Sequence, residues 1–284
     1  QIKPINTTSF KKIIEKIKTE NFESIGIGFL HSYADSKNEN VLKKYILENL
    51  PGVEVSISSD VCPEIREYER FTTTVINAYI KPLMSNYLKK LDYELKEKGF
   101  NCPLLLMTSG GTLTNVSSAC NNPVRLVESG PAGGAILATS IAKDLNLNKV
   151  ISFDMGGTTA KITIIEDKKA IKAREFEVDR KARFKKGSGF PLRIPVIEMV
   201  EIGAGGGSIA RVNKLEQIIT GPDSAGSLPG PACYSNGGIL PTITDADLVI
   251  GKINPENFAS GKIKLSKDLA TNAITKNIGQ IVNL

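Results

Sequence analysis

One short stretch, FDMGGTTAK at residues 153–161, constrains the fold more than any other part of this chain. The apolar run KVISF leads into Asp154, two glycines and two threonines follow at 156–159, and a second apolar run, KITII, comes next. Apolar runs that flank a glycine pair predict two strands joined by a tight turn. Such a turn leaves backbone N–H groups unpaired and close together, and a group of donors of this kind binds anions, phosphate above all.

The aspartate before the turn needs an explanation, because a carboxylate repels phosphate. Asp154 fits a phosphate site if Mg²⁺ or a metal-bound water lies between the two, since Mg²⁺ prefers carboxylate and phosphate oxygens. The GxxxxGK[ST] spacing of a Walker loop is absent, and no GxGxxG fingerprint follows the first strands. The alternative is an ordinary hairpin with a Gly-Gly turn. This short motif does not decide between the two.

The composition is that of a globular protein, with 41% hydrophobic and 23% charged residues. A chain of 284 residues forms one large domain or two ordinary ones. It has neither a signal peptide nor an apolar run near the ~20 residues of a membrane helix, so we expect a cytoplasmic protein without a membrane partner. The net charge of +6 is scattered apart from a basic run at 180–186, and Trp is absent, so we expect no nucleic-acid partner.

Cysteine and histidine usage excludes several kinds of site. The four cysteines are widely spaced without a CxxC pair, which argues against a zinc ribbon or a thioredoxin motif and favours reduced thiols. His31 is the only histidine, so a metal site with several histidines is excluded within this chain. A residue at the end of a strand is the favoured interpretation of His31, with a catalytic base as the alternative.

The first half of the chain alternates between strand and helix patterns. We expect helices at 10–20 and 39–50, strands at 24–30, 53–58 and 103–107, and long helices from 64 to about 98 that are interrupted near Pro82. Ser129 is a candidate N-cap for a helix at 129–144. This alternation predicts an α/β domain with a mostly parallel sheet.

The character of the sequence changes near residue 150. Successive antiparallel strands are expected from about 149, with a domain boundary at 147–149. The last third is rich in glycine and proline, and the stretch GAGGGSIA at 203–210 could allow a close backbone approach to a nucleotide. A glycine-rich connector explains that stretch equally well.

Three further features have a functional and a structural interpretation. Of the pair Asp245 and Asp247, one could cap a helix while the other contacts a metal or a substrate. When each residue is considered separately, a capping or structural role is favoured. A packed small residue is the favoured interpretation of Cys233, with a nucleophile or a ligand as the alternatives. The charged residues of EIREYER at 64–70 form either a functional cluster or an ion-paired helix face, and the helix face is favoured.

Seven blocks of the sequence, in the same order, resemble the hydantoinase A / 5-oxoprolinase family. This resemblance implies an α/β fold of the actin–hexokinase–Hsp70 class, with two lobes that clasp ATP and a first lobe that is incomplete at its N-terminus. Residues 1–75 would be the C-terminal part of the N-terminal domain, and residues 76–284 the hydantoinase A domain with its second lobe from about 149. We expect the chain to be an internal part of a longer protein. The blocks are FDMGGTTAK, FLHSYADSKNE, SSDVCPEIREYERFTTTVINAYIKPLM, SGPAGG, GAGGGSIA, GPDSAGSLPGPACY and PTITDADLVIGKINPENF.

The resemblance implies a phosphate site at the turn, with Asp154 as the catalytic residue of the Mg²⁺ shell. Many members of the family read GGTSTD here, whereas this chain has Lys161 in place of the closing acidic residue. The lysine could lie near phosphate, although a strand residue facing solvent is favoured. The complete candidate set is Gly156, Gly157, Thr158, Thr159, Gly205, Gly206 and Gly207 for ATP, and Asp154, Asp245 and Asp247 for Mg²⁺.

The reaction that the resemblance implies is ATP-dependent hydrolytic opening of a cyclic amide such as hydantoin, N-methylhydantoin or 5-oxoproline. Phosphorylation of the amide carbonyl oxygen turns a poor electrophile into one that water can attack. This phosphoryl transfer needs positioning and charge neutralisation more than covalent chemistry by the protein. Relatives act with a B-type subunit, so we expect such a partner in an oligomer. The alternatives are a subunit of an ATP-dependent ketone carboxylase and a non-catalytic nucleotide-binding fragment. Without a first phosphate loop, this chain by itself is expected to be inactive.

Overall fold

The computed structural model describes residues 10–182 and 187–283, so most of the basic run at 180–186 lies outside the described residues. The chain divides into two compact units. The first comprises residues 1–148 and 166–198, and the second comprises residues 149–165 and 199–284. Both units combine helices with strands, so the chain is an α/β protein.

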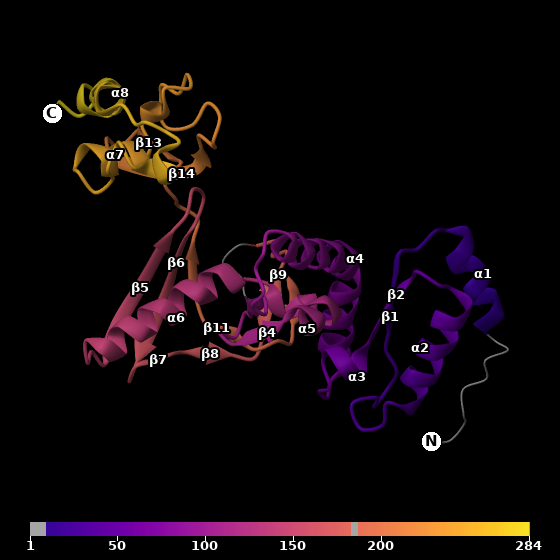
Figure 1. Ribbon diagram of the computed structural model, residues 1–284. Helices are drawn as coiled ribbons and strands as arrows, with labels where there is room; N and C mark the ends of the chain where they lie inside the picture. The colour runs from indigo at the N-terminus through magenta and orange to yellow at the C-terminus, as the bar shows by residue number, and fades with distance from the viewer. Residues whose placement is uncertain (1–9, 183–186, 284) are drawn as a thin grey trace. The chain divides into compact units, whose positions relative to one another are not determined.

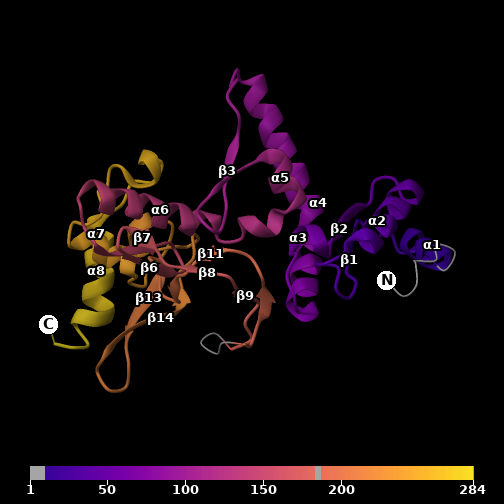
Figure 2. The ribbon, with the colours of Figure 1, turned by 90° about the horizontal axis from the view of Figure 1, so that it is seen from below.

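The first unit begins with three layers. Strands β1 (Ser24–Ile27) and β2 (Glu54–Ile57) pair in parallel. Helices α1 (Lys11–Thr19) and α2 (Lys37–Asn49) cover one face, and the long helix α4 (Glu67–Glu97) lies against the same strands on the other side (Figures 1 and 2). Alternate residues of a strand point to opposite faces, so Val55 enters the apolar core while Ser56 accepts a hydrogen bond from Asn77 of α4. The core residues are Ile14, Ile17, Ile27, Leu42, Ile46, Leu50, Val55 and Ile57.

Helix α4 runs without interruption through Pro82, so the predicted break near this proline is wrong. A proline inside a helix removes one backbone hydrogen bond. Packing on both sides of Pro82 offsets this loss: Ala78 and Leu88 are buried, and Lys81 reaches the sheet. The Lys81 ammonium donates to the Val55 carbonyl at 3.0 Å and lies 3.2 Å from a Glu54 carboxylate oxygen. Tertiary contacts therefore hold the helix together.

The next part of the first unit departs from a parallel sheet. Strand β3 (Leu105–Met107) pairs antiparallel with β4 (Leu113–Asn115), and β1–β2 is the parallel pair among the described residues, so the prediction of a mostly parallel sheet is wrong. Ser129 is the first residue of α6 rather than its N-cap, because the cap position belongs to Glu128, which has a φ of 63° and makes no side-chain cap bond. The helices here are α3 (Ser58–Val61), α5 (Val116–Asn121), the 3₁₀ turn η2 (Pro123–Leu126) and α6 (Ser129–Asp144).

Residues 166–198 return to the first unit, which the sequence did not predict. Within this segment β9 pairs antiparallel with β10, and β8 pairs antiparallel with β11. Leu192 and Ile194 pack with Val124 in a second apolar core, and the Arg193 backbone N–H donates to the Thr73 hydroxyl of α4 at 2.9 Å. The strands are β7 (Lys169–Ala170), β8 (Lys172–Ala173), β9 (Phe176–Val178), β10 (Phe190–Leu192) and β11 (Val196–Ile197).

The second unit contains a sheet in the order β12-β6-β5 and a separate antiparallel pair, β13 and β14. The helices surround a small core around Cys233 and Leu248. Among the described residues, none of the helices combines the length and the apolar character that crossing a membrane requires. The elements are β5 (Lys149–Met155), β6 (Ala160–Glu166), β12 (Val200–Ile202), β13 (Ser208–Val212), β14 (Ile218–Ser224), α7 (Ile243–Val249), α8 (Lys267–Ile274), the 3₁₀ turns η3 (Ala232–Tyr234) and η4 (Phe258–Gly261), and the π-helical turn η5 (Thr275–Gly279).

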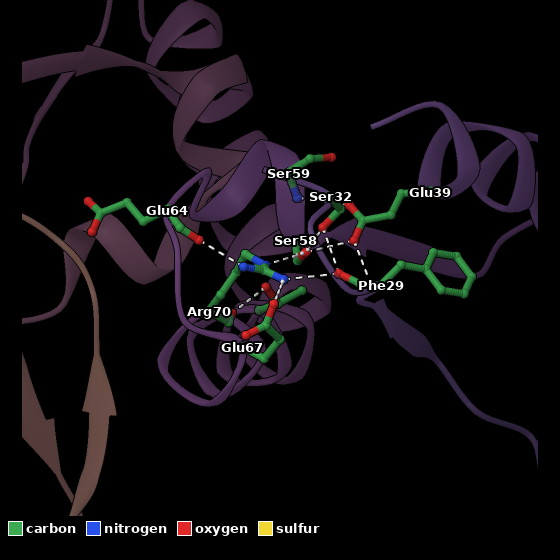
Figure 3. Close-up of polar contacts among 9 residues, drawn as sticks. Phe29, Ser32, Glu39, Ser58, Ser59, Glu64, Glu67 and Arg70 are labelled. Atoms are coloured by element: carbon green, nitrogen blue, oxygen red, sulfur yellow. Dashed lines mark hydrogen bonds and ion pairs between the residues drawn. The ribbon is translucent and has the colours of Figure 1, made fainter. Parts of the chain in front are cut away.

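A buried network of charges fixes the loops that follow β1 and β2 (Figure 3). Arg70 and Glu39 are both fully buried, and the Ser58 hydroxyl lies between them. This hydroxyl donates to Glu39 Oε1 at 2.6 Å and accepts from Arg70 Nε at 3.2 Å. Backbone N–H groups of Phe29 and Ser59 donate to the same carboxylate at 2.9 and 2.8 Å. Arg70 therefore does not lie on an ion-paired surface face.

The Glu39 carboxylate should make the first unit sensitive to acid. Burial raises the pKa of Glu39, but hydrogen bonds from Ser58, Ser59 and Phe29 outweigh burial and hold that pKa below its ordinary value of 4.5. A lowered carboxyl pKa gives stability above pH 4.5 that is lost as the pH falls through the folded-state pKa. Urea unfolding from pH 3 to 7 should show this loss, and Glu39→Gln should flatten it. Glu48→Gln, at an exposed i,i+4 pair, is the control; equal pH profiles for both variants would contradict the assignment.

Candidate phosphate-binding site

The turn between β5 and β6 is a tight one that points three residues into solvent. The Gly156 N–H donates to the Thr159 carbonyl at 2.9 Å. Gly156, Gly157 and Thr158 are exposed. Neither glycine has a positive φ, so the turn is not the primed hairpin turn that a Gly-Gly pair would favour. Backbone conformation therefore does not account for the two glycines.

The second glycine loop, residues 203–207, lies directly against this turn. The N–H groups of Gly206 and Gly207 donate to the carbonyls of Gly156 and Gly157 at 2.9 and 2.8 Å. Gly205 is buried in the contact, and a methyl group on it would meet the Thr158 nitrogen at 2.6 Å. The structure thus brings together two of the predicted loops, and 203–207 is not a mere connector.

These contacts fix the direction of two free N–H groups. The peptide bonds of both loops are trans, so the carbonyl of one residue and the N–H of the next point in opposite directions. Because the carbonyls of Gly156 and Gly157 point toward the glycine loop, the N–H groups of Gly157 and Thr158 point away from it. Neither N–H has an acceptor among the residues that the structure describes. Two exposed donors side by side are an arrangement that can bind an anion, and the phosphate site stays a prediction.

A third element, which the sequence analysis did not include, completes the arrangement. Thr244, in the first turn of α7, donates through its backbone N–H and through its hydroxyl to the Gly206 carbonyl, each at 2.8 Å. The Ser208 hydroxyl accepts from the Gly205 N–H at 2.9 Å, and the Ala225 N–H donates to the Gly207 carbonyl at 2.8 Å. A threonine at a helix start gave no sequence signal for this contact, because the loop it holds is distant in the chain.

The Asp245 carboxylate is held within the fold by hydrogen bonds. Its carboxylate is fully buried and accepts hydrogen bonds from the Thr242 N–H and hydroxyl and from the N–H groups of Ala232 and Cys233. The Thr242 hydroxyl accepts from the Asp245 N–H in return, which forms a capping box at the start of α7. Burial and the neighbouring Asp245 raise the pKa of the Cys233 thiol, so Cys233 is a packed thiol. With its oxygens occupied, we withdraw Asp245 from the metal set.

The two other predicted carboxylates lie apart from such networks. Asp154 is exposed near the end of β5, two residues before the turn, and no hydrogen bond or ion pair joins its side chain to another described residue. Asp247 lies 3.6 Å from the Lys252 ammonium. Lys161 is a β6 residue opposite Glu201 of β12. The described part of the chain holds no cluster of three or more His, Cys, Asp or Glu side chains arranged for a metal ion.

Two glycine substitutions at this site should differ in their effect on stability, because only one of the two glycines is packed in the loop contact. Gly205→Ala forces a methyl group to within 2.7 Å of the Gly156 carbonyl oxygen, and a backbone contact of this kind cannot relax cheaply. We expect it to lower the free energy of unfolding by about 1–3 kcal/mol. Gly157→Ala places its methyl group where nothing lies within 4 Å, so it should leave stability unchanged. Thermal unfolding of both variants is the measurement, and equal midpoints would contradict the observed loop contact.

Comparison with known proteins identifies the family of this chain. The sequence model of the Hydantoinase/oxoprolinase family matches residues 70–284. The chain belongs to the hydantoinase/oxoprolinase family. An uncharacterized protein of Methanocaldococcus jannaschii is 46% identical over 278 residues, which are 97% of this chain and 41% of that protein. The acetone carboxylase beta subunit of Xanthobacter autotrophicus is 29% identical over 291 residues, covering 100% of this chain and 39% of the subunit.

A solved structure extends the comparison to three dimensions. The ATP-dependent caprolactamase from Pseudomonas jessenii superposes with a TM-score of 0.75 at 29% identity, over 100% of this chain and 40% of the caprolactamase chain. This hydantoinase/oxoprolinase chain therefore spans about two fifths of the length of these three relatives. Members of the family include ATP-dependent enzymes, and some of them are named as subunits of larger complexes.

Proposed function

We propose that the protein uses ATP to open a cyclic amide by phosphorylating the amide carbonyl oxygen. The observation that carries the proposal is the pair of exposed N–H groups on Gly157 and Thr158, which the glycine loop at 203–207 aims away from itself. The likeness to an ATP-dependent caprolactamase supports a ring amide as the substrate class. Hydantoin, N-methylhydantoin and 5-oxoproline are the rings to test first.

Three residues of the turn have a role in this proposal. The N–H groups of Gly157 and Thr158 would bind phosphate oxygens of ATP, and the hydroxyls of Thr158 and Thr159 add further donors. The absence of any neighbour within 4 Å of a methyl group on Gly157 leaves room for such a ligand. Pre-oriented donors stabilise transferring phosphoryl groups without reorganisation during the reaction, which is how a site of this kind accelerates phosphoryl transfer.

Asp154 fits a Mg²⁺ ion bound together with ATP. Mg²⁺ usually takes one or two carboxylates and completes its shell with waters and phosphate oxygens, so it does not require a preformed cluster of protein ligands. Asp154 offers an exposed carboxylate beside the turn, unengaged by other described residues. When bound, the metal would neutralise phosphate charge, and Asp154 would orient it. Asp247 stays a weaker candidate because a lysine already lies beside it.

The architecture of the whole protein is part of the proposal. We infer a fold of the actin–hexokinase–Hsp70 class, in which residues 1–75 and 76–284 belong to successive domains and the second lobe starts near 149. The names of relatives as subunits support a B-type partner subunit in an oligomer. A carboxylase subunit is the second candidate, because the acetone carboxylase beta subunit is similar over the whole of this chain. Both candidates share the same phosphorylation step on a carbonyl compound.

The decisive variant is Asp154→Asn in the complete polypeptide, co-expressed with its B-type partner. We expect ATP hydrolysis to be stimulated by one cyclic amide and to fall at least about tenfold in the variant, the loss of ~1.4 kcal/mol or more of metal and phosphate binding. Asp268→Asn, an exposed carboxylate in the first turn of α8, is the matched control. Stimulation only by a ketone with bicarbonate would assign the carboxylase branch. Unchanged hydrolysis in Asp154→Asn would refute the assigned role of the turn.

A further inference from the structure

The contacts of Thr244 form a continuous chain of hydrogen bonds that ends at the proposed phosphate site. The Thr244 hydroxyl and N–H both donate to the Gly206 carbonyl, each at 2.8 Å. The same peptide group carries the N–H of Gly207, which donates to the Gly157 carbonyl at 2.8 Å. The Gly157 carbonyl in turn shares its peptide group with the free N–H of Thr158. Two peptide groups thus connect the Thr244 hydroxyl to one of the two donors.

A second chain reaches the other donor without Thr244. The Ser208 N–H donates to the Gly205 carbonyl at 2.9 Å, and the N–H of Gly206, in the same peptide group, donates to the Gly156 carbonyl at 2.9 Å. The peptide group of Gly156 ends in the free N–H of Gly157. The two chains run side by side, so each of the two exposed donors is backed by its own series of hydrogen bonds.

Hydrogen bonds in series polarise one another. A carbonyl that accepts a bond makes the N–H of its own peptide group a stronger donor, and each step strengthens the next by roughly 10–30%. The Gly206 carbonyl accepts two bonds from Thr244, whereas the corresponding Gly205 carbonyl accepts from the Ser208 N–H. Thr244 is also buried, at 6% exposure, so water cannot replace its hydroxyl as a donor.

We propose that Thr244 is a positioning residue whose hydroxyl orients and strengthens the Thr158 N–H as a phosphate donor. This inference rests on the proposed function, because the anion in question is the phosphate of the nucleotide. It adds Thr244 to that proposal, a residue outside the turn and 86 positions after Thr158 in the chain. It also says that the effect passes from Thr244 to Thr158. It also predicts an asymmetry: loss of the hydroxyl weakens the Thr158 donor and leaves the Gly157 donor nearly as it was.

The test uses three variants of the complete polypeptide. Thr244→Val removes the hydroxyl at nearly constant shape, and Thr244→Ser restores it. Thr271→Val is the matched control, because the Thr271 hydroxyl also donates to a backbone carbonyl at 2.8 Å in the same unit, but on α8. Amide proton shifts of Gly157 and Thr158 are recorded by NMR in the free protein. Binding of inorganic phosphate and of MgADP is then measured by calorimetry.

We expect Thr244→Val to shift the Thr158 amide proton upfield, leave the Gly157 amide proton nearly in place, and weaken phosphate and MgADP binding by about 1.3- to fourfold, because the variant changes the strength of one charge-assisted hydrogen bond by roughly 10–30% and does not remove it. Thr244→Ser and Thr271→Val should match the wild type. An unshifted Thr158 amide, equal shifts at both amides, or unchanged phosphate binding in Thr244→Val would overturn the inference. If Thr244→Val shifts the Thr158 amide proton but the wild-type protein binds neither phosphate nor MgADP, the proposed function would be overturned instead.

Discussion

Replacement of Arg70 by alanine is expected to unfold the first unit, or to bring it close to unfolding, at room temperature. The Arg70 guanidinium donates to the carbonyls of Phe29 and Glu64 at 3.0 and 2.8 Å and to the Ser58 hydroxyl at 3.2 Å (Figure 3). It also lies 3.4 Å from a Glu67 carboxylate oxygen. These partners belong to the loops after β1 and β2 and to the first turn of α4, so one side chain joins three segments.

The expected loss is about 3–5 kcal/mol, the usual cost of removing one partner from a buried charge network. Truncation removes the cation that reaches the buried Glu39 carboxylate through the Ser58 hydroxyl, and it leaves the Glu64 carbonyl without its Arg70 donor. A domain of this size has ~5–15 kcal/mol of stability in total, so this loss is a large share. The rings of Tyr33 and Phe71, within 5.5 and 5.1 Å of the guanidinium carbon, would lose their packing partner as well.

Chemical denaturation followed by circular dichroism measures the effect, with two variants for comparison. Arg70→Lys keeps the charge but loses the planar fork of donors, so an intermediate loss is expected. Arg66→Ala is the control, because the Arg66 side chain is 68% exposed and its ion pair with Glu69, at 3.8 Å, lies at the surface. Equal unfolding midpoints for Arg70→Ala and Arg66→Ala would show that the network contributes little.

Arg70 also shows where the sequence stops being informative. Local patterns predict an element well when the residues within it determine its structure. The helix at α1, the strand at β2 and the hairpin around Gly156 follow from spacing and turn residues. A charged residue in EIREYER indicates an exposed helix face by the same logic. It is buried here because the loops after β1 and β2 supply acceptors at Phe29 and Ser58, in addition to the nearby Glu67. Such pairing depends on tertiary contacts that no local pattern contains.

The candidate site divides in the same way. Glycine content and the position of Asp154 between two apolar runs predict the turn and its chemistry, and the glycine loop at 203–207 stands out by composition. The sequence does not show that the two loops bond to each other, because the hydrogen bonds join backbone atoms and leave no mark on side-chain identity. Thr244 escapes notice because the loop that its hydroxyl bonds lies far away in the chain. Asp245 is the opposite case. Its acidic side chain suggests a metal ligand, although its oxygens accept hydrogen bonds from the surrounding backbone.

The second large effect is expected for Asp245→Asn, which should destabilise the second unit by about 3 kcal/mol. Four donors converge on the Asp245 carboxylate at 2.8–3.2 Å. An asparagine has the same shape but replaces one acceptor oxygen by an NH₂ group, so one or more of these buried donors would face another donor. Hydrogen bonds to a charged acceptor contribute ~1.5–3 kcal/mol each, and a buried donor left without an acceptor costs a further ~1–3 kcal/mol.

Because Asp245 lies next to Thr244, the consequence should extend to the phosphate site. The capping box fixes the first turn of α7, and that turn holds the glycine loop through Thr244. We therefore expect Asp245→Asn to speed hydrogen exchange at the amides of Cys233 and Thr242 first, and at Gly207 with them. Asp247→Asn is the matched control, since its carboxylate pairs with Lys252 at a half-exposed position. If Asp245→Asn were as stable as Asp247→Asn, the carboxylate would be free for another role, and the metal assignment that we withdraw would have to be restored.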